Sequence, residues 1–230
     1  MDIDLRSFTP ARVALGRTGH SLPTAELLRF QLDHAKARDA VACELDQASI
    51  AHPHVLLRTA ARDRATYLRR PDLGRKLDPG SRAQLVPGDY EAAIVVDDGL
   101  SAPAIHRHAN GLLDALLPQL TTWRLAPLTV VLHGRVAVAD EVAQALGARM
   151  AVILIGERPG LTSPDSLGIY LTWDPRAGRT DAERNCISNV RAEGLSYALA
   201  AHKLVYLMNA ARTLQLSGVG LKENAVNELT

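Results

Sequence analysis

Three polar segments follow apolar runs of the chain, and their side chains could bind a polar ligand. They read DDGLS at 97–101, HGRV at 133–136 and GERPG at 156–160. In an open α/β sheet, ligands bind beyond the carboxyl ends of the strands. If the apolar runs are neighbouring strands, the three segments lie side by side on one edge of the sheet. We therefore predict a ligand site where they converge.

Segment 97–101 also has a purely structural explanation. Gly99 permits a sharp turn from strand to helix, and Ser101 can cap the helix that follows. The functional alternative is a polar ligand at the start of that helix. The chain has no G-x-G-x-x-G after the first predicted strand and no G-x-x-x-x-G-K-[ST]. A usual dinucleotide or P-loop nucleotide site is therefore not supported.

Two single residues, Glu157 and Cys186, are candidates for binding a ligand. Glu157 could pair with its neighbour Arg158, or its carboxylate could accept hydrogen bonds from amide or hydroxyl groups of a ligand. Cys186 lies in RNCISN at 184–189, a stretch that we expect to form a polar loop. A cysteine is usually a small core residue, but polar surroundings favour a ligand contact.

Metal binding by the chain's own side chains is not predicted. The eight histidines form no H-E-x-x-H motif. The pairs His52/His54 and His106/His108 are separated by two residues, and on a helix that spacing points side chains in different directions. The sequence also has no convincing pair of nucleophile and base.

The composition limits the class of protein. The chain has 230 residues, of which 47% are hydrophobic, and a net charge of +1, so no global charge imbalance points to nucleic acid or an anionic membrane. No apolar run approaches the about 18–20 residues of a membrane span. The acidic start, MDID, lacks the features of a signal peptide, and two cysteines do not make a disulfide framework. These features predict a cytoplasmic protein.

Basic residues are concentrated between Arg58 and Arg82. This stretch contains eight basic and three acidic residues. It is most simply a solvated face or an intersubunit surface, and the alternative is a phosphate- or nucleotide-binding surface. Tyr67 is its only aromatic residue, which argues against base stacking on single-stranded nucleic acid.

The first part of the chain, 1–88, is predicted to be helical. Thr24 is a candidate N-cap, and Glu26 suits the positive end of a helix dipole. The helix is expected to continue to about residue 45. Its stripe of Leu28, Leu32 and Ala35 indicates packing against the core or a partner helix. A second helix should end before Pro71, because the residue before proline disfavours helical geometry.

The second part, 89–230, alternates between predicted strands and helices. Apolar runs at 92–96, 128–132 and 151–155 are typical of strands buried on both faces, and 168–173 is a candidate fourth strand. Helices are expected at about 102–116, 139–147 and 196–214. This order predicts an α/β fold: a Rossmann-like, mostly parallel sheet with flanking helices, preceded by the helical N-terminal region.

At these segments the sequence resembles the ethanolamine ammonia-lyase light chain. The matching blocks are in the family's order and span about residues 5 to 220. They are ARVALGRTG at 11–19, LLRF at 27–30, YLRRPDLGR at 67–75, DGLS at 98–101, GERPGL at 156–161 and RNCISN at 184–189. Any one block is weak, but together they are a strong signal.

The resemblance implies a fold, an activity and a partner. It implies a Rossmann-like domain after a helical N-terminal part, bound to a large TIM-barrel subunit in a hexamer of heterodimers. Ethanolamine would be converted to acetaldehyde and ammonia by a radical mechanism with adenosylcobalamin. The large subunit would carry the catalytic residues, so none is assigned in this chain, which we expect to be inactive alone.

The resemblance also implies three cobalamin-binding residues. Val136, after the matched Gly134 and Arg135, would pack on the cofactor. Glu157 would bind the polar rim of the cofactor, and Cys186 would contact it too. Some relatives have a long N-terminal extension that directs the enzyme into a bacterial microcompartment. This chain starts almost at the domain, so a microcompartment is only an alternative to the cytoplasm.

Two other functions are weighed against this one. The first is a stand-alone Rossmann-like module that binds a small phosphorylated ligand or a nucleotide. The second is a regulatory protein that binds nucleic acid through its basic stretch, which would make binding strongly dependent on salt. The missing phosphate motifs argue against the first, and the near-neutral charge against the second.

Overall fold

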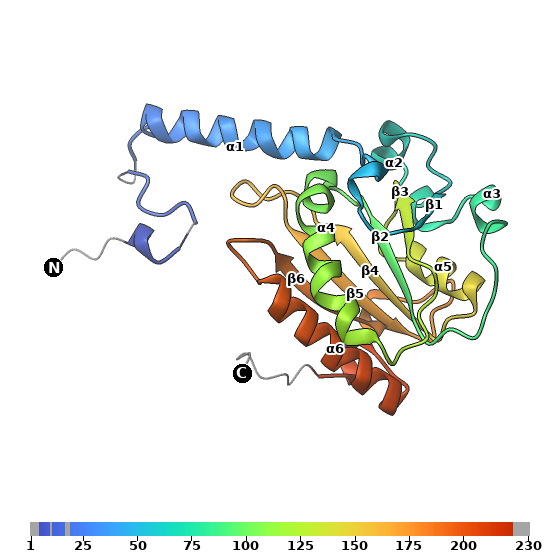
Figure 1. The fold of residues 1–230 in the computed structure, drawn as a ribbon. Helices are drawn as coiled ribbons and strands as arrows, with labels where there is room; N and C mark the ends of the chain where they lie inside the picture. Colours follow the sequence, from blue (N-terminus) through green and yellow to red (C-terminus); the bar gives the residue numbers. More distant parts are fainter. Residues whose placement is uncertain (1–4, 10, 17–18, 223–230) are drawn as a thin grey trace.

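A single six-stranded sheet forms the centre of the protein (Figure 1). The computed structural model describes residues 5–9, 11–16 and 19–222. The strand order is β1-β3-β2-β4-β5-β6. The strands are β1 (Val55–Arg58), β2 (Ala93–Asp97), β3 (Thr129–Leu132), β4 (Met150–Gly156), β5 (Leu167–Trp173) and β6 (Arg184–Val190).

The sheet is only partly parallel. Strands β1, β3, β2 and β4 pair in parallel, but β5 pairs antiparallel with both β4 and β6. The α/β class is confirmed, whereas a mostly parallel, Rossmann-like sheet is not. The physical reason is the connection at 157–166, which contains no helix. Parallel neighbours need a long crossover, so a short connection returns the chain in the opposite direction.

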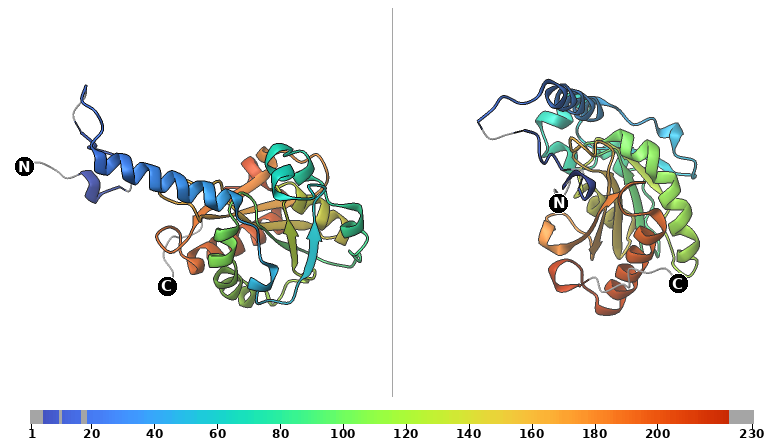
Figure 2. Two further views of the ribbon diagram at one scale, coloured as in Figure 1. Left: turned by 90° about the horizontal axis from the view of Figure 1, so that it is seen from above. Right: turned by 90° about the vertical axis from the view of Figure 1, so that its left-hand side faces the viewer.

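Helices cover both faces of the sheet, and two hydrophobic clusters lie beneath them (Figures 1 and 2). Strand residues alternate between the clusters: Ile94 and Val96 pack towards α4 and α6, while Ala93 and Val95 pack towards α5. Each buried Val or Ile contributes about 1.5–3 kcal/mol. The helices are α1 (Thr24–Ala42), α2 (Arg64–Arg69), α3 (Pro79–Arg82), α4 (Ala102–Leu116), α5 (Val138–Leu146) and α6 (Tyr197–Leu214).

The elements predicted in the second part of the chain are confirmed within one or two residues. Runs of apolar residues at 92–96, 128–132, 151–155 and 168–173 form β2 to β5, and the three predicted helices form α4 to α6. All residues of β2 and β4 are buried, as the continuous apolar runs indicate. No helix in the described ranges is long and apolar enough to cross a lipid bilayer.

The N-terminal region contains a strand as well as helices. Strand β1 pairs with β3, so residues 55–58 belong to the same sheet as the second part of the chain. The prediction of a helical region missed this strand, because four residues are too few to show a periodicity. The division of the chain into two domains at residue 88 stays a prediction. The helix expected before Pro71 is confirmed as α2, which ends at Arg69.

Helix α1 extends away from the sheet, as two views of the ribbon show (Figures 1 and 2). Its N-cap residue is Pro23, without a side-chain cap, so the prediction that Thr24 caps the helix is wrong. Leu28 and Leu32 are 59% and 54% exposed, which excludes them from the core of this chain. Their alternative role, packing against a partner, stays a prediction.

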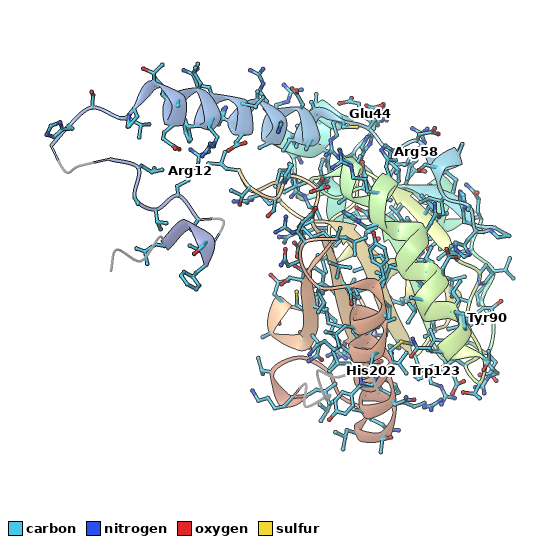
Figure 3. The ribbon with its side chains drawn as sticks, turned by 60° about the vertical axis from the view of Figure 1, so that its left-hand side comes forward. Arg12, Glu44, Arg58, Tyr90, Trp123 and His202 are labelled. Atoms are coloured by element: carbon cyan, nitrogen blue, oxygen red, sulfur yellow. The ribbon has the colours of Figure 1, made fainter. Side chains whose placement is uncertain are left out.

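The segment before α1 lies along that helix. Arg12 forms an ion pair with Asp33 at 2.8 Å, and its guanidinium lies 4.6 Å from the ring centroid of Phe30 (Figure 3). These contacts cover one side of α1. Leu28 and Leu32 stay exposed.

Substitutions in the two kinds of helix should therefore differ in cost. Leu112 in α4 is fully buried, so Leu112→Ala should lower the free energy of unfolding by about 2–5 kcal/mol through lost burial and a cavity. Leu28→Ala, on exposed α1, should change it by no more than about 0.5 kcal/mol. Urea unfolding followed by circular dichroism measures both. An equal loss in the two variants would contradict the exposed position of α1.

Candidate functional site

The segments after β2, β3 and β4 lie side by side, as expected for segments that follow neighbouring strands. The backbone N–H of His133 donates to Asp98 Oδ1 at 2.7 Å, which joins the second segment to the first. The N–H of Leu100 donates to the carbonyl of Gly156 at 3.0 Å, which joins the first to the third. The three segments therefore converge at one edge of the sheet. The ligand site expected there stays a prediction.

The acidic residues of this edge are buried within the protein. Asp98 is fully buried and pairs with Arg64, whose Nη1 lies 2.9 Å from Asp98 Oδ2. Burial raises the pKa of Asp98, and the charge of Arg64 opposes this rise. Asp97 accepts a hydrogen bond from the N–H of Gly99, and burial, together with the charge of Asp98, raises its pKa well above the usual value. Both side chains are therefore buried parts of the fold.

The structural explanation of segment 97–101 is confirmed. Gly99 has a φ of 52°, in the left-handed region that glycine tolerates. Ser101 is the N-cap of α4 and accepts a hydrogen bond from the N–H of Ala104. Its hydroxyl also donates to the carbonyl of Pro164, which anchors the connection between β4 and β5.

The loop at 133–136 is held in place by hydrogen bonds, ring stacking and close packing. His133 has a φ of 62°, its carbonyl accepts from Thr59 Oγ1 at 2.8 Å, and its ring stacks on Tyr67 with a centroid distance of 6.1 Å. Gly134 packs against Asp97 so closely that a Cβ atom there would lie 1.7 Å from Oδ2. This rigidity sets the position of the residues that follow.

Arg135 and Val136 are presented by this fixed loop. The N–H of Arg135 donates to the carbonyl of Gly74 at 2.8 Å, and its guanidinium lies 4.3 Å from the ring centroid of Tyr67. Val136 is half-buried and packs against the hydrophobic cluster beneath α5. The sequence resemblance selected Val136, and the structure places it at the margin of that cluster.

Glu157 lies over the antiparallel strands β5 and β6. Its carboxylate accepts hydrogen bonds from the hydroxyl of Ser166 and from the N–H of Asn189, the latter at 3.4 Å. A Cβ atom on Gly168 would lie 2.9 Å from Glu157 Oε1, so the missing side chain leaves room for the carboxylate. Within the described residues, no ion pair joins Glu157 to Arg158, so that alternative is not supported.

Cys186 lies on a strand and not in a loop. The stretch at 184–189 forms most of β6, which corrects the prediction. The polar residues in this stretch concealed the strand. They can be part of it because they have partners: buried Arg184 pairs with Asp140 of α5, and Asn185 donates to the carbonyl of Leu221. Cys186 itself is exposed.

Tyr170 connects Cys186 to the rest of this face. It lies directly opposite Cys186 in the ladder of β5 and β6. Burial is the main cause that raises the pKa of its hydroxyl, and the neighbouring Cys186 raises it further. Tyr170 packs against the same cluster as Val136, and the charge of Glu157 acts on both Tyr170 and Cys186. The three residues selected from the sequence therefore lie on one face of the sheet.

This face is open over β5 and β6. Helix α5 packs on β2 and β4, whereas α4 and α6 pack on β5 from the opposite side. The open face offers an apolar side chain, a carboxylate and a thiol to a large ligand. Within the described residues, no group of three or more His, Cys, Asp or Glu side chains could hold a metal ion.

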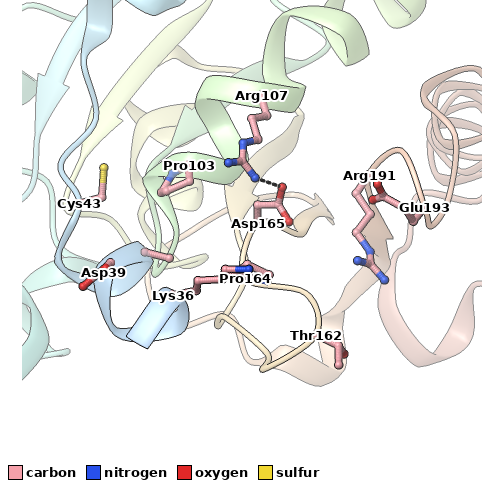
Figure 4. Close-up of a pocket in the computed structure, with 11 residues that line it drawn as sticks. Lys36, Asp39, Cys43, Pro103, Arg107, Thr162, Pro164, Asp165, Arg191 and Glu193 are labelled. Atoms are coloured by element: carbon pink, nitrogen blue, oxygen red, sulfur yellow. Dashed lines mark hydrogen bonds and ion pairs between the residues drawn. The ribbon is translucent and has the colours of Figure 1, made fainter. Parts of the chain in front are cut away.

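A separate groove of about 920 Å³ lies between α1 and the body of the protein (Figure 4). Sequence analysis did not find it, because its walls come from distant segments. Its lining carries charges of both signs, and Arg107 forms an ion pair with Asp165 in this lining. Burial lowers the pKa of the adjacent His108, while Asp165 opposes that change. The groove contains none of the three residues selected from the sequence.

The close packing of Gly134 in the loop at 133–136 can be tested by substitution. Gly134→Ala would force a Cβ atom against Asp97, so we expect it to lower the free energy of unfolding by about 1–3 kcal/mol. Gly160→Ala is a matched control, because the nearest atom to its Cβ would lie at 3.6 Å, an ordinary contact. Chemical unfolding measures both variants. Equal stability of the two would show that loop 133–136 adapts and is not fixed.

Comparison with known proteins identifies the family of this chain. Residues 3–222 match the family described as ethanolamine ammonia-lyase light chain (EutC). The ethanolamine ammonia-lyase small subunit of Azotobacter vinelandii is 59% identical, over 96% of this chain and 87% of the relative. Those of Ralstonia nicotianae and Pseudomonas paraeruginosa are 57% and 56% identical, over 96% and 97% of this chain and 87% of each relative. The chain therefore belongs to the ethanolamine ammonia-lyase light-chain family, a family of lyase subunits.

Proposed function

We propose that this chain is the small subunit of a carbon–nitrogen lyase that converts ethanolamine to acetaldehyde and ammonia. In this proposal it holds adenosylcobalamin against a large subunit. The observation that supports it is the shared position of Val136, Glu157 and Cys186 on one open face of the sheet. These residues come from three segments of the sequence, and each matches the family's pattern.

The chemistry of this face suits a corrinoid. A corrin ring is broad and carries amide groups on its rim, and an open sheet face can accept such a shape without a deep pocket. Glu157 is aligned by Ser166 and Asn189 and can accept hydrogen bonds from rim amides. Half-buried Val136 would offer apolar contact to the ring, and exposed Cys186 would contact it too.

The proposal also divides the work between two subunits. When bound, adenosylcobalamin would supply the radical chemistry of the reaction. The residues of this chain bind the cofactor and exclude water from one side of it. The side chains that handle ethanolamine would come from a large TIM-barrel subunit, in a hexamer of heterodimers. The location would be the cytoplasm, with a bacterial microcompartment as the alternative.

The surface of the chain supports a large partner. Leu28 and Leu32 on α1 are exposed. On β5, α4 and α6 pack on one face and leave the opposite face open. The relatives are named small subunits, which implies a larger subunit as the partner. A stand-alone small-ligand module is less favoured, because the family match spans nearly the whole chain.

The activity is tested by acetaldehyde release from ethanolamine with adenosylcobalamin present. The chain alone should be inactive, and the chain co-expressed with its large subunit should be active. A pair that assembles and binds cobalamin without releasing acetaldehyde would reject the substrate. A pair that binds no cobalamin would reject the proposed function.

Glu157 provides a sharper test of cofactor binding. Glu157→Ala should weaken cobalamin binding by the assembled enzyme about tenfold or more, the usual effect of losing a hydrogen bond to a charged group. Arg158→Ala is the matched control, since Arg158 is an exposed neighbour in the same loop. Equilibrium dialysis followed by absorbance of bound cobalamin measures both. Unchanged affinity in Glu157→Ala would remove Glu157 from the site.

A further inference from the structure

A second hollow, of about 620 Å³, borders the same face of the sheet beside Val136. Its walls come from the turn after α2, the start of α5 and the connection between β5 and β6. Five basic and two acidic side chains line it: Arg75, Lys76, Arg135, Arg179, Arg184, Glu141 and Asp181. We infer that this basic pocket binds a phosphate group, namely the phosphodiester in the nucleotide tail of cobalamin. The inference rests on the proposed function and deepens it.

The basic side chains of the pocket fall into two groups. Arg184 and Arg179 are neutralised within the chain, since Arg184 pairs with buried Asp140 and Arg179 with Asp174. Arg75, Lys76 and Arg135 form no ion pair with any carboxylate in the described ranges. Three like charges around one hollow repel each other, and a bound anion removes that repulsion.

Arg135 is held ready for such a ligand. Its guanidinium stacks on the ring of Tyr67, and its backbone N–H is bonded to Gly74. Its Nε atom is buried and has no hydrogen-bond partner, which is unusual in a folded protein. A Cβ atom on Gly74 would meet Arg135 Cγ at 3.1 Å, so the turn that carries Arg75 packs directly against Arg135.

The two carboxylates of the pocket do not cancel these charges. Glu141 accepts a hydrogen bond from the N–H of Leu77 at 2.7 Å, so its charge is turned to the backbone. Asp181 is fully exposed and lies 3.6 Å from Arg184. Arg75, Lys76 and Arg135 therefore stay available to an anion.

The lining also indicates which anion fits. Arginine and lysine together are typical of phosphate sites, where the planar guanidinium can form two hydrogen bonds. No aromatic side chain lines the pocket, so a nucleobase has nothing on which to stack. Val136 belongs both to this pocket and to the face proposed for the corrin. A phosphodiester attached to the corrin would therefore be placed within reach of the three cations.

The test compares two corrinoids on the co-expressed, assembled enzyme. Cyanocobalamin carries the nucleotide tail, and dicyanocobinamide lacks the tail and its phosphate. The double variant Arg75→Gln/Lys76→Gln should bind cyanocobalamin about tenfold more weakly and with less dependence on salt, because charge-assisted hydrogen bonds are lost. Its affinity for dicyanocobinamide should change less than twofold. Arg82→Gln, an exposed basic residue outside the pocket, is the matched control and should change neither.

Each other outcome rejects a defined statement. Equal losses for both corrinoids, or no loss for either, would overturn the assignment of the phosphodiester to this pocket. Binding of inorganic phosphate that the double variant abolishes, with unchanged affinity for cyanocobalamin, would also overturn it, since the pocket would then serve a separate phosphate. A wild-type complex that binds neither corrinoid would instead reject the proposed function, and the inference with it.

Discussion

The buried ion pair between Arg64 and Asp98 connects the parts of the structure on which the site depends. Arg64 donates to Asp98 and to the carbonyl of Gly99, and its Nε donates to the carbonyl of Val41 near the end of α1. The second oxygen of Asp98 accepts the N–H of His133. One pair thus joins α1, α2 and the turns after β2 and β3. A buried charge that loses its partner typically costs about 3–5 kcal/mol, so these parts are held together.

The change of strand direction after β4 creates the open face. A further crossover helix would have covered the sheet next to α5, as in a doubly wound fold. The chain instead returns through a short connection and places Glu157 above Gly168 at the start of β5. Strand β6 then brings Cys186 opposite Tyr170. The antiparallel pair, which departs from the expected Rossmann-like order, is therefore what exposes the candidate cofactor residues.

The sequence was most informative where burial is complete on both faces. Continuous apolar runs predicted β2 and β4 because no polar residue interrupts them. The direction of β5 could not be predicted, since it depends on the path of the connection and not on the strand's own residues. Strand β6 was missed because Arg184 reads as polar, although its pairing with Asp140 buries it. Val136 came from the family resemblance alone, whereas Glu157 and Cys186 were also candidates by residue type and polar surroundings. No periodicity would have selected any of the three.

The basic stretch between Arg58 and Arg82 shows why a count of charges does not locate a site. Arg64 is buried with Asp98, and Arg70 pairs with Asp72 at 2.7 Å, so these charges serve the fold or the surface. A buried cation must have a partner within the protein, because desolvation otherwise makes its charge too costly. Only cations that stay partly in water can hold their charge for a ligand. Arg75 and Lys76 meet this condition, and the fold brings them to Arg135 from another part of the chain.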